Sequence, residues 1–465
     1  MTSNSNIIKS KNKYLESLKK RNLNTPQILQ TGLYLTWGTS LLLALTTISG
    51  AQVQRHAIKT VGEDAARSVI TAQQIKDSLA DMGANAVNQL LVKPGQNLTA
   101  DKGFEYRRER LGKFLVQAAQ NITYGDKERE PITNMVNGLT QYMLVIQQAR
   151  DANARGDNNA LLTHYYEAVK INEKQIQPNA DTLNQVNLDT LNQTYEQQKI
   201  ANAASELLIL MTGLTLLVVL LGTQLFLYRR MRRVINPKLL AATIISFLFI
   251  SYSIYALESS VSNLKLAKED AFESLYALRQ ARALAYSANR DESRFLLDRA
   301  NAAKYEQAFQ EKINKIVTLP PGYTLKTIIP KLAKGEQVKD FTGLIGDEFK
   351  NITSAGEREA AVATMTALDK YLDIDKQIRQ LAVSGKYAEA IQLATGLSQG
   401  ESDWAFEQFK IAHQKLLDIN QQQFDGAIKD GFANVQNLEI IALITAITVS
   451  TLALFGLRQR LLEYQ

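Results

Sequence analysis

One run of basic residues has the types and spacing needed to bind a ligand, within "FEYRRERLGKF" at residues 104–114. The run holds three arginines: Arg107, Arg108 and Arg110. Guanidinium groups on two neighbouring helical turns can hold a carboxylate through paired hydrogen bonds. The alternative is an exposed helix surface, on which Glu109 would pair with Lys113 and Glu105 with Arg108 at helical spacing.

No pattern of an enzyme or a metal site accompanies these arginines. The chain has no cysteine and three histidines far apart in sequence: His56, His164 and His413. The H-E-x-x-H, G-x-S-x-G, P-loop and G-x-G-x-x-G patterns do not occur. Acidic pairs such as Glu63-Asp64 and Asp291-Glu292 fall within predicted helices, where solvated faces are expected. We therefore predict a protein that is not an enzyme, with no catalytic residue, cofactor or metal ligand.

Four apolar runs dominate the rest of the chain and contain no Asp, Glu, Lys, Arg or His: 31–53, 207–228, 239–257 and 440–457. Each approaches the roughly 20 residues that cross a bilayer as a helix. Uncharged spans also argue against a proton or ion pathway. The first run could be a signal peptide ending at "TTISGAQ", but the 30 residues before it favour an uncleaved anchor.

The net charge of +7 comes from the segments outside the two long polar stretches. Residues 1–30 hold six basic residues against one acidic residue, and residues 229–238 hold five and none. The long stretches are slightly acidic, with 17 basic and 18 acidic residues in 54–206, and 23 and 26 in 258–439. This distribution indicates membrane topology and excludes a nucleic-acid partner.

By the positive-inside rule, the N-terminal arm 1–30, the loop 229–238 and the tail 458–465 are cytoplasmic. The stretches 54–206 and 258–439 are then extracytoplasmic. The residues that determine this topology are Arg229, Arg230, Arg232, Arg233 and Lys238. The N-terminal arm either contacts a partner or is held inside by charge and attracted to anionic lipid.

Both long stretches show helical periodicity. In the first we expect helices over 65–90, 102–122, from Pro131 to about Gly156, and from "RGDN" past Pro178 into the second span. In the second we expect a long helix from the third span, with its break at "TLPPGYTLK". An irregular insertion over 318–356 follows, with a short element around "DFTGLIGDEF". The remaining helices are expected over 357–383 and from Lys386 into the fourth span.

The second stretch repeats the first. At an offset of 206, one set of residues falls on identical ones without a gap: Glu63, Asp64, Ala65, Ser68, Gln74, Leu90 and Leu91. At an offset of 229, a second set does so: Leu139, Tyr142, Gln148, Arg150 and Gly156. Similarity between any two helices explains part of this agreement. The shared register with the spans favours an internal duplication, with the insertion in the second copy.

The order of a span, four helices and a second span resembles the four-helix-bundle sensor domain of bacterial chemoreceptors and sensor kinases. "RGDNNALL" and "SGKYAEAI" precede the fourth helix in the two copies, and "RRMRRVINPKL" resembles the entry to a HAMP linker. The third span follows almost at once, and only "RQRLLEYQ" follows the fourth, so we expect neither a HAMP domain nor an output domain. In a sensor of this class, Arg107, Arg108 and Arg110 are the candidates for holding a carboxylate ligand.

We therefore predict an all-α integral protein of the bacterial inner membrane, with four transmembrane helices and two extracytoplasmic antiparallel four-helix bundles. The two copies would form a pseudo-dimer within one chain, sense a small-molecule ligand or an envelope partner, and pass a signal to a separate protein. Its expected partners are the lipid bilayer, a protein that carries the output function, and a small ligand. The alternative function is a membrane scaffold or assembly factor that transmits no signal.

Overall fold

A computed structural model describes residues 24–123, 125–231 and 236–462 of the chain. Within these ranges nearly every residue is helical, and the one pairing of extended backbone is an isolated bridge between Thr318 and Thr342. The prediction of an all-α chain is therefore confirmed for the described residues. Two compact units share them. The first, which we call the spanning unit, comprises the described residues of 1–56, 197–262 and 431–465.

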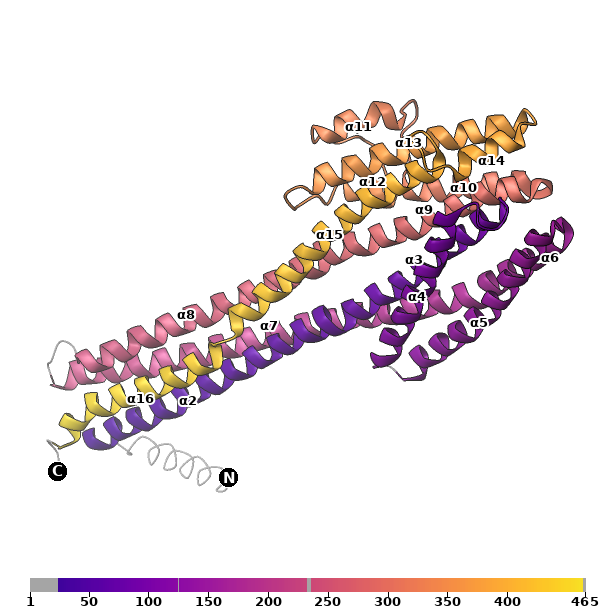
Figure 1. The fold of residues 1–465 in the computed structure, drawn as a ribbon. Helices are drawn as coiled ribbons and strands as arrows, with labels where there is room; N and C mark the ends of the chain where they lie inside the picture. The colour runs from indigo at the N-terminus through magenta and orange to yellow at the C-terminus, as the bar shows by residue number, and fades with distance from the viewer. Residues whose placement is uncertain (1–23, 124, 232–235, 463–465) are drawn as a thin grey trace, which may run out of the picture. The chain divides into compact units, whose positions relative to one another are not determined.

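The second, which we call the paired unit, comprises a first half, residues 57–196, and a second half, residues 263–430. Figure 1 colours the chain by residue number, so that the first half appears in indigo to magenta and the second half in pink to yellow. The contacts between the two halves make them one compact unit.

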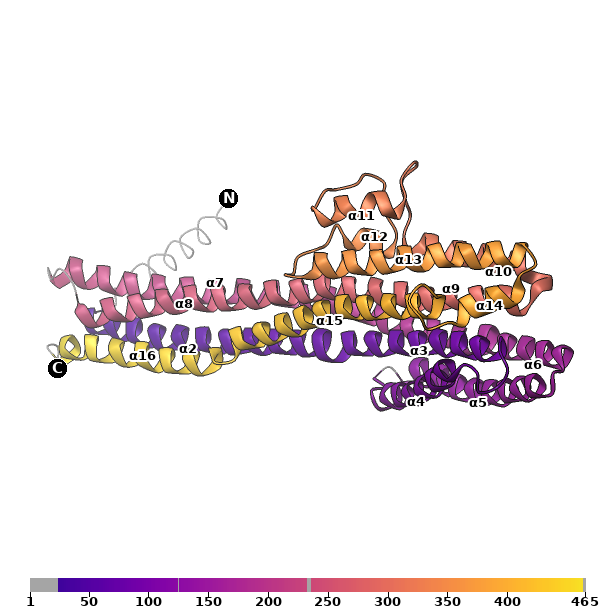
Figure 2. The ribbon, with the colours of Figure 1, turned by 45° about the horizontal axis from the view of Figure 1, so that its top comes forward.

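The spanning unit holds the four apolar runs on four helices: α2 (Thr25–Ala57), the end of α7 (Gln177–Met231), α8 (Pro237–Lys265) and α16 (Leu438–Leu462). Four helices of the described chain are long and apolar enough to cross a membrane, and these runs lie in them. The helices run side by side in Figures 1 and 2. Small residues at their contacts are buried, as Ser40, Ala242 and Ala442 show, and the Ser40 and Ser450 hydroxyls lie 3.0 Å apart.

Two of these helices continue without interruption into the paired unit's sequence. Helix α2 passes through a π-helical segment, η1 (Ile58–Ala65), into α3 (Ala66–Leu90). Helix α8 does the same through η3 (Leu266–Phe272) into α9 (Glu273–Leu297). A π-helical turn inserts an extra residue into the helix, and such turns are frequent at functional positions. The helical periodicity of the sequence gave no sign of these insertions.

The first half contains α3, α4 (Leu98–Gln120), α5 (Asp126–Arg155) and α6 (Asn158–Ile171), which continues through η2 (Asn172–Ile176) into α7. Side chains of Asn97 and Asp157 cap α4 and α6 by accepting from the amides of Ala100 and Ala160. Helix α5 begins at Asp126, so the expectation that Pro131 opens it is wrong. The Gly125 carbonyl already accepts from the amides of Glu128 and Arg129, so the helix forms before Pro131 is reached.

The second half contains α9, the 3₁₀ turn η4 (Arg299–Asn301), α10 (Ala302–Ile316), α13 (Glu357–Val383), α14 (Tyr387–Thr395) and α15 (Ser402–Val435). Helix α13 has the predicted bounds. The long helix of the third span breaks at Asp298, well before the predicted break at "TLPPGYTLK". Asp298 leaves the helical conformation there, and its carboxylate accepts hydrogen bonds from Asn301 and Tyr305.

Two other expectations for the second half are also wrong. The stretch 318–356, predicted to be irregular, contains α11 (Leu325–Ala333) as well as the short α12 (Leu344–Glu348) near the predicted element. The last helix does not run unbroken from Lys386 into the fourth span. It stops at Thr395, resumes at Ser402, and stops again between Val435 and Leu438. Gly400, with φ of +98°, provides a left-handed residue in the first gap.

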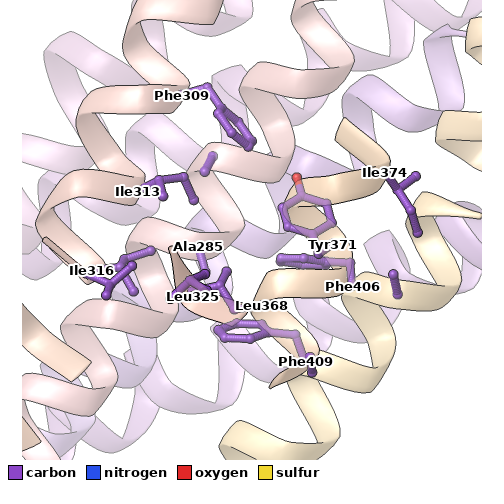
Figure 3. Packing of buried hydrophobic residues seen from close by; sticks show 14 of the residues in the cluster. Ala285, Phe309, Ile313, Ile316, Leu325, Leu368, Tyr371, Ile374, Phe406 and Phe409 are labelled. Carbon is purple, nitrogen blue, oxygen red and sulfur yellow. The ribbon is translucent and has the colours of Figure 1, made fainter. Parts of the chain in front are cut away.

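Each half of the paired unit has its own hydrophobic core. The core of the second half is rich in aromatic rings, including Phe309, Tyr371, Phe406 and Phe409 (Figure 3). The ring centroids of Tyr371 and Phe406 lie 5.1 Å apart. Ala80 of α3 belongs to this second core, so the first half contributes to the packing of the second.

Candidate functional site

Helices α3 and α9 lie against each other and hold the two halves of the paired unit together. Asp77 Oδ2 lies 3.7 Å from Arg279 Nη1, and further along both helices Asn88 Oδ1 accepts a hydrogen bond from the Ser293 hydroxyl. Residue numbers at the contact therefore rise together, so the two helices are parallel. A cavity or charge at this contact is therefore shared by both halves.

Ionisable side chains are buried along this contact. Asp77 and Asp81 of α3 are each only 4% exposed. Burial raises the pKa of Asp77 above its ordinary value, although Arg282 and Arg279 act in the opposite direction. Buried charges cost several kcal/mol unless they are paired, and they concentrate at functional sites. The contact between α3 and α9 thus has the buried charges that are typical of a functional site.

Arg107, one of the three predicted ligand-binding arginines, lies at this contact. Its Nε donates to Asp81 Oδ2 at 2.5 Å, and its Nη2 donates to the Tyr286 hydroxyl of the second half at 3.2 Å. The Lys410 ammonium lies 3.9 Å from the same carboxylate oxygen. Arg107 therefore joins the two halves, and its guanidinium already has a carboxylate partner.

Of the other two predicted arginines, Arg108 lies on the exposed side of α4 and Arg110 is half-buried. Arg108 pairs with Glu105 at 2.8 Å, and Lys113 pairs with Glu109 at 2.6 Å. Arg110 stacks over the rings of Tyr106 and Phe114. The ion pairs are those of an exposed helix, whereas Arg110 Nε is buried without a hydrogen-bond partner among the described residues. The structure does not bring the three arginines together around one point.

A cavity of about 360 Å³ lies between the two halves. Four helices line it: Lys76 and Ala80 come from α3, Asp181 from α7, Arg290 from α9 and Lys312 from α10. Lys76 pairs with Asp181 at 2.6 Å, and Lys312 pairs with Asp291. The volume is in the range of small-molecule sites.

Arg290 is the residue of this cavity whose guanidinium is incompletely hydrogen-bonded, although the Asp291 carboxylate beside it attracts its charge. It is 5% exposed, and its Nε and Nη1 atoms have no hydrogen-bond partner among the described residues. Gly83 of α3 makes room for it, because a Cβ at that position would lie 3.2 Å from Arg290 Nη1. Burial lowers the pKa of Arg290, and the neighbouring Arg294 lowers it further. Since arginine stays charged in proteins, this guanidinium is suited to receive an anion.

Sequence reasoning missed Arg290 and misplaced the acidic pair beside it. Asp291 and Glu292, predicted to lie on a solvated face, are each 1% exposed. Glu292 accepts from the Ser402 hydroxyl at 2.8 Å, and burial together with Asp375 raises its pKa well above its ordinary value. Because α9 is covered on several sides by other helices, it has no free face at this level. The unusual charge density of "NRDESR" was the one available signal.

The histidines and the predicted topology residues lie elsewhere. His413 is fully buried, and burial followed by Arg282 lowers its pKa to about 3. No group of three or more His, Cys, Asp or Glu side chains suited to a metal ion occurs in the ranges that the structure describes. Arg229 and Arg230 end α7 on its exposed side, and Lys238 begins α8. The predicted topology residues Arg232 and Arg233 lie outside the described residues.

Comparison with known proteins gives one match. Residues 57–196, the whole first half of the paired unit, match the family model of the actinobacterial sensor domain. No curated protein and no solved structure matches the chain. The match and the four membrane-span-like helices together support a membrane protein that is similar to sensors.

Proposed function

We propose that this protein is the signal-input component of a membrane sensor, and that it binds a small anionic ligand between the two halves of its paired unit. Arg290 carries this proposal, because it is a buried cation whose Nε and Nη1 have no hydrogen-bond partner among the described residues, and it lines a cavity between the halves. The match of the first half to a sensor domain supports a sensory function for this unit. A carboxylate or phosphate group would provide the missing acceptors.

The two halves are copies of one extracytoplasmic helical bundle. In support, the matched residues Arg150 and Arg379 each lie over a phenylalanine ring: Arg150 lies 4.2 Å from the ring centroid of Phe104, and Arg379 lies 4.8 Å from that of Phe309. Glycines in the left-handed conformation precede α6 in the first half and α14 in the second half, Gly156 with φ of +76° and Gly385 with φ of +77°. This arrangement is a pseudo-dimer in a single chain, the counterpart of two chains that pair side by side.

Helices α3 and α9 transmit the signal in this proposal. A ligand that changes their contact would also act on α2 and α8, because each pair of helices is continuous. The basic residues of 229–238 hold the connection between the second and third spans in the cytoplasm of a bacterial inner membrane. A separate cytoplasmic or membrane protein detects the movement of the spans.

The test is the thermal stability of the purified full chain in detergent with acetate, succinate, phosphate or sulfate. A ligand that binds the folded state raises the melting temperature by mass action. We expect one of these anions to do so, and Arg290→Gln to abolish the rise. Arg108→Gln is the matched control, since it removes the same charge from an exposed position.

Two results would reject the proposal. One is that none of the four anions changes the melting temperature. The other is that the Arg290→Gln and Arg108→Gln variants respond like the wild type. Co-purification of a stoichiometric membrane complex that no small molecule alters would instead favour a scaffold.

A further inference from the structure

A second pocket lies within the first half, away from Arg290. Its volume is about 280 Å³, and it lies among η1, α3, α4, α5 and α7. Ser68, Asn121, Glu128 and Asn187 line it, with Glu63, Asp64 and Arg67. Asn187 is 2% exposed, and its Oδ1 has no hydrogen-bond partner among the described residues. A buried acceptor without a donor costs about 1–3 kcal/mol, so a ligand that donates to it would be favoured.

The second half builds the same turn beside the same helix. Asn121 Nδ2 donates to Ser68 Oγ at 2.6 Å, and Asn351 Nδ2 donates to Ser274 Oγ at 2.9 Å. The Glu128 carboxylate accepts from the Thr123 amide at 2.8 Å. Likewise, the Glu357 carboxylate accepts from the Thr353 amide at 2.9 Å. The turn that borders the first-half pocket is therefore built in the same way in both halves.

The asparagine behind the pocket is repeated as well. Asn187 Nδ2 donates to the Leu183 carbonyl at 2.9 Å, and Asn420 Nδ2 donates to the Leu416 carbonyl at 3.2 Å. Asn420 also donates to Glu348 Oε1 at 3.4 Å. Glu348 ends α12, which packs on α9. In the second half, the chain's own insertion thus fills the place that is a pocket in the first half.

The side chain that fills this place is an uncharged hydrogen-bonding group. Glu348 is 3% exposed, and burial followed by Glu357 raises its pKa to about 8. At neutral pH its carboxyl group therefore keeps its proton and can donate to Glu357. The surroundings of Glu348 therefore disfavour a negative charge and favour a group that donates a hydrogen bond.

The open pocket of the first half disfavours a negatively charged ligand even more strongly. Three acidic residues line it against one basic residue, Arg67. The loop between α4 and α5 is short, so the first half has no counterpart of α12 to fill the pocket. The acceptor that needs a donor is Asn187 Oδ1. A small cation with N–H groups matches both the charge and the hydrogen bonding.

We propose that the first-half pocket binds a small ammonium-bearing molecule, whose N–H groups donate to Asn187 Oδ1 and to the Glu128 carboxylate. The site is distinct from the cavity at Arg290 in position and in ligand charge. It is the open form of a site that Glu348 occupies in the second half.

Binding of ethylammonium, propionamide and propionate to the purified full chain in detergent tests this proposal by calorimetry. We expect ethylammonium to bind with one site per chain, propionamide to bind more weakly, and propionate not to bind. Asn187→Leu should weaken ethylammonium binding about tenfold or more, because it removes the buried acceptor. The matched variant Asn420→Leu, in the filled site, should leave it unchanged.

A gain of binding provides the sharper test. Glu348→Ala should open the filled site and raise the stoichiometry of ethylammonium from one to two per chain. Arg290→Gln should not affect ethylammonium, which separates this site from the proposed anion site. The proposal is overturned if propionate binds as well as ethylammonium. It is also overturned if Asn187→Leu binds like the wild type while melting cooperatively.

Discussion

The two halves of the paired unit build the same turn and then treat the groove beside it differently. In the first half Ser68, Asn121 and Asn187 border an open pocket. In the second half the corresponding Ser274, Asn351 and Asn420 lie beside α12, and Glu348 takes the space. An insertion of this kind replaces a ligand by a side chain of the same protein. One half is thereby made independent of the ligand, while the other keeps the site.

A second difference concerns the two helices at the contact. Helix α9 carries the buried run from Arg290 to Arg294, whereas α3 presents Gly83 and Ala84 at the corresponding level. The large charged side chains of one half therefore occupy space that the small residues of the other leave. Because of this asymmetry, the cavity between the halves has the buried cation Arg290 on one wall. Two identical halves would instead form either two such cavities or none.

The largest expected difference in stability is between substitutions of Arg379 and of its counterpart Arg150. Arg379 donates to both oxygens of Asp375, at 2.8 and 2.9 Å, in a buried pair. Arg150 donates to the Gln89 amide oxygen at 2.8 Å. Arg379→Met should cost about 3 kcal/mol, because it leaves a buried carboxylate, and Arg150→Met about 1 kcal/mol. Chemical denaturation of the full chain in detergent measures the free energy of unfolding of both variants. Equal losses of stability would contradict a stronger buried ion pair in the second half.

The next effect is a pH dependence that only the filled groove should have. Because the folded pKa of Glu348 lies near 8, above its ordinary value of 4.5, the folded state holds an extra proton between these values. Its contribution to stability is complete at acid pH and is lost as the pH rises towards 8. We expect a loss of roughly 2–3 kcal/mol from pH 5 to pH 8. Glu348→Gln should remove this pH-dependent loss of stability. If the stability of the variant depends on pH as that of the wild type does, the raised pKa of Glu348 is refuted.

A smaller effect should come from the turn that places α12. Gly343 has φ of +97°, and a Cβ there would lie 2.9 Å from the Ile316 carbonyl oxygen. Gly343→Ala should cost about 2 kcal/mol through backbone strain and this contact. Gly125, at the turn before α5, has φ of +64° and open space around it. Gly125→Ala should therefore lower the stability by only about 1 kcal/mol. Melting temperatures in the reverse order would show that α12 is not held by this turn.

The smallest effect should be similar in the two halves. Asn121→Ala removes the hydrogen bond from the turn to Ser68, at 2.6 Å. Asn351→Ala removes the one to Ser274, at 2.9 Å, together with a longer one to the Asp270 carbonyl, at 3.2 Å. Each should cost about 1 kcal/mol. Hydrogen exchange at the start of α5 and α13 would localise the loss. A large difference between the two variants would argue against matched roles for these turns.

Hydropathy and helical periodicity predicted much of the fold. The four uncharged runs identified the helices that could span a membrane, because length and apolarity alone define them. The bounds of α13 followed from glycines at both ends. The breaks at Asp298 and before Ser402 depend on local hydrogen bonds and a left-handed glycine, which leave little trace in a pattern of apolar residues.

The candidate site was much less predictable. Arg107 was singled out for its neighbours in sequence, and its actual partners, Asp81 and Tyr286, come from two other helices. Arg290 was not singled out, because its burial depends on Gly83 of another helix. Similarly, the filling of a groove by Glu348 becomes visible only when the two halves are compared in space.

The central claim is that an anion held by Arg290 changes the contact between the two halves. The chain has no native cysteine, so spin labels can be attached at Gly112→Cys on α4 and Gln310→Cys on α10, which are exposed positions. The distance distribution between the labels should shift with whichever of acetate, succinate, phosphate or sulfate raises the melting temperature most, and Arg290→Gln should abolish the shift. An identical distribution with and without that anion would contradict the account.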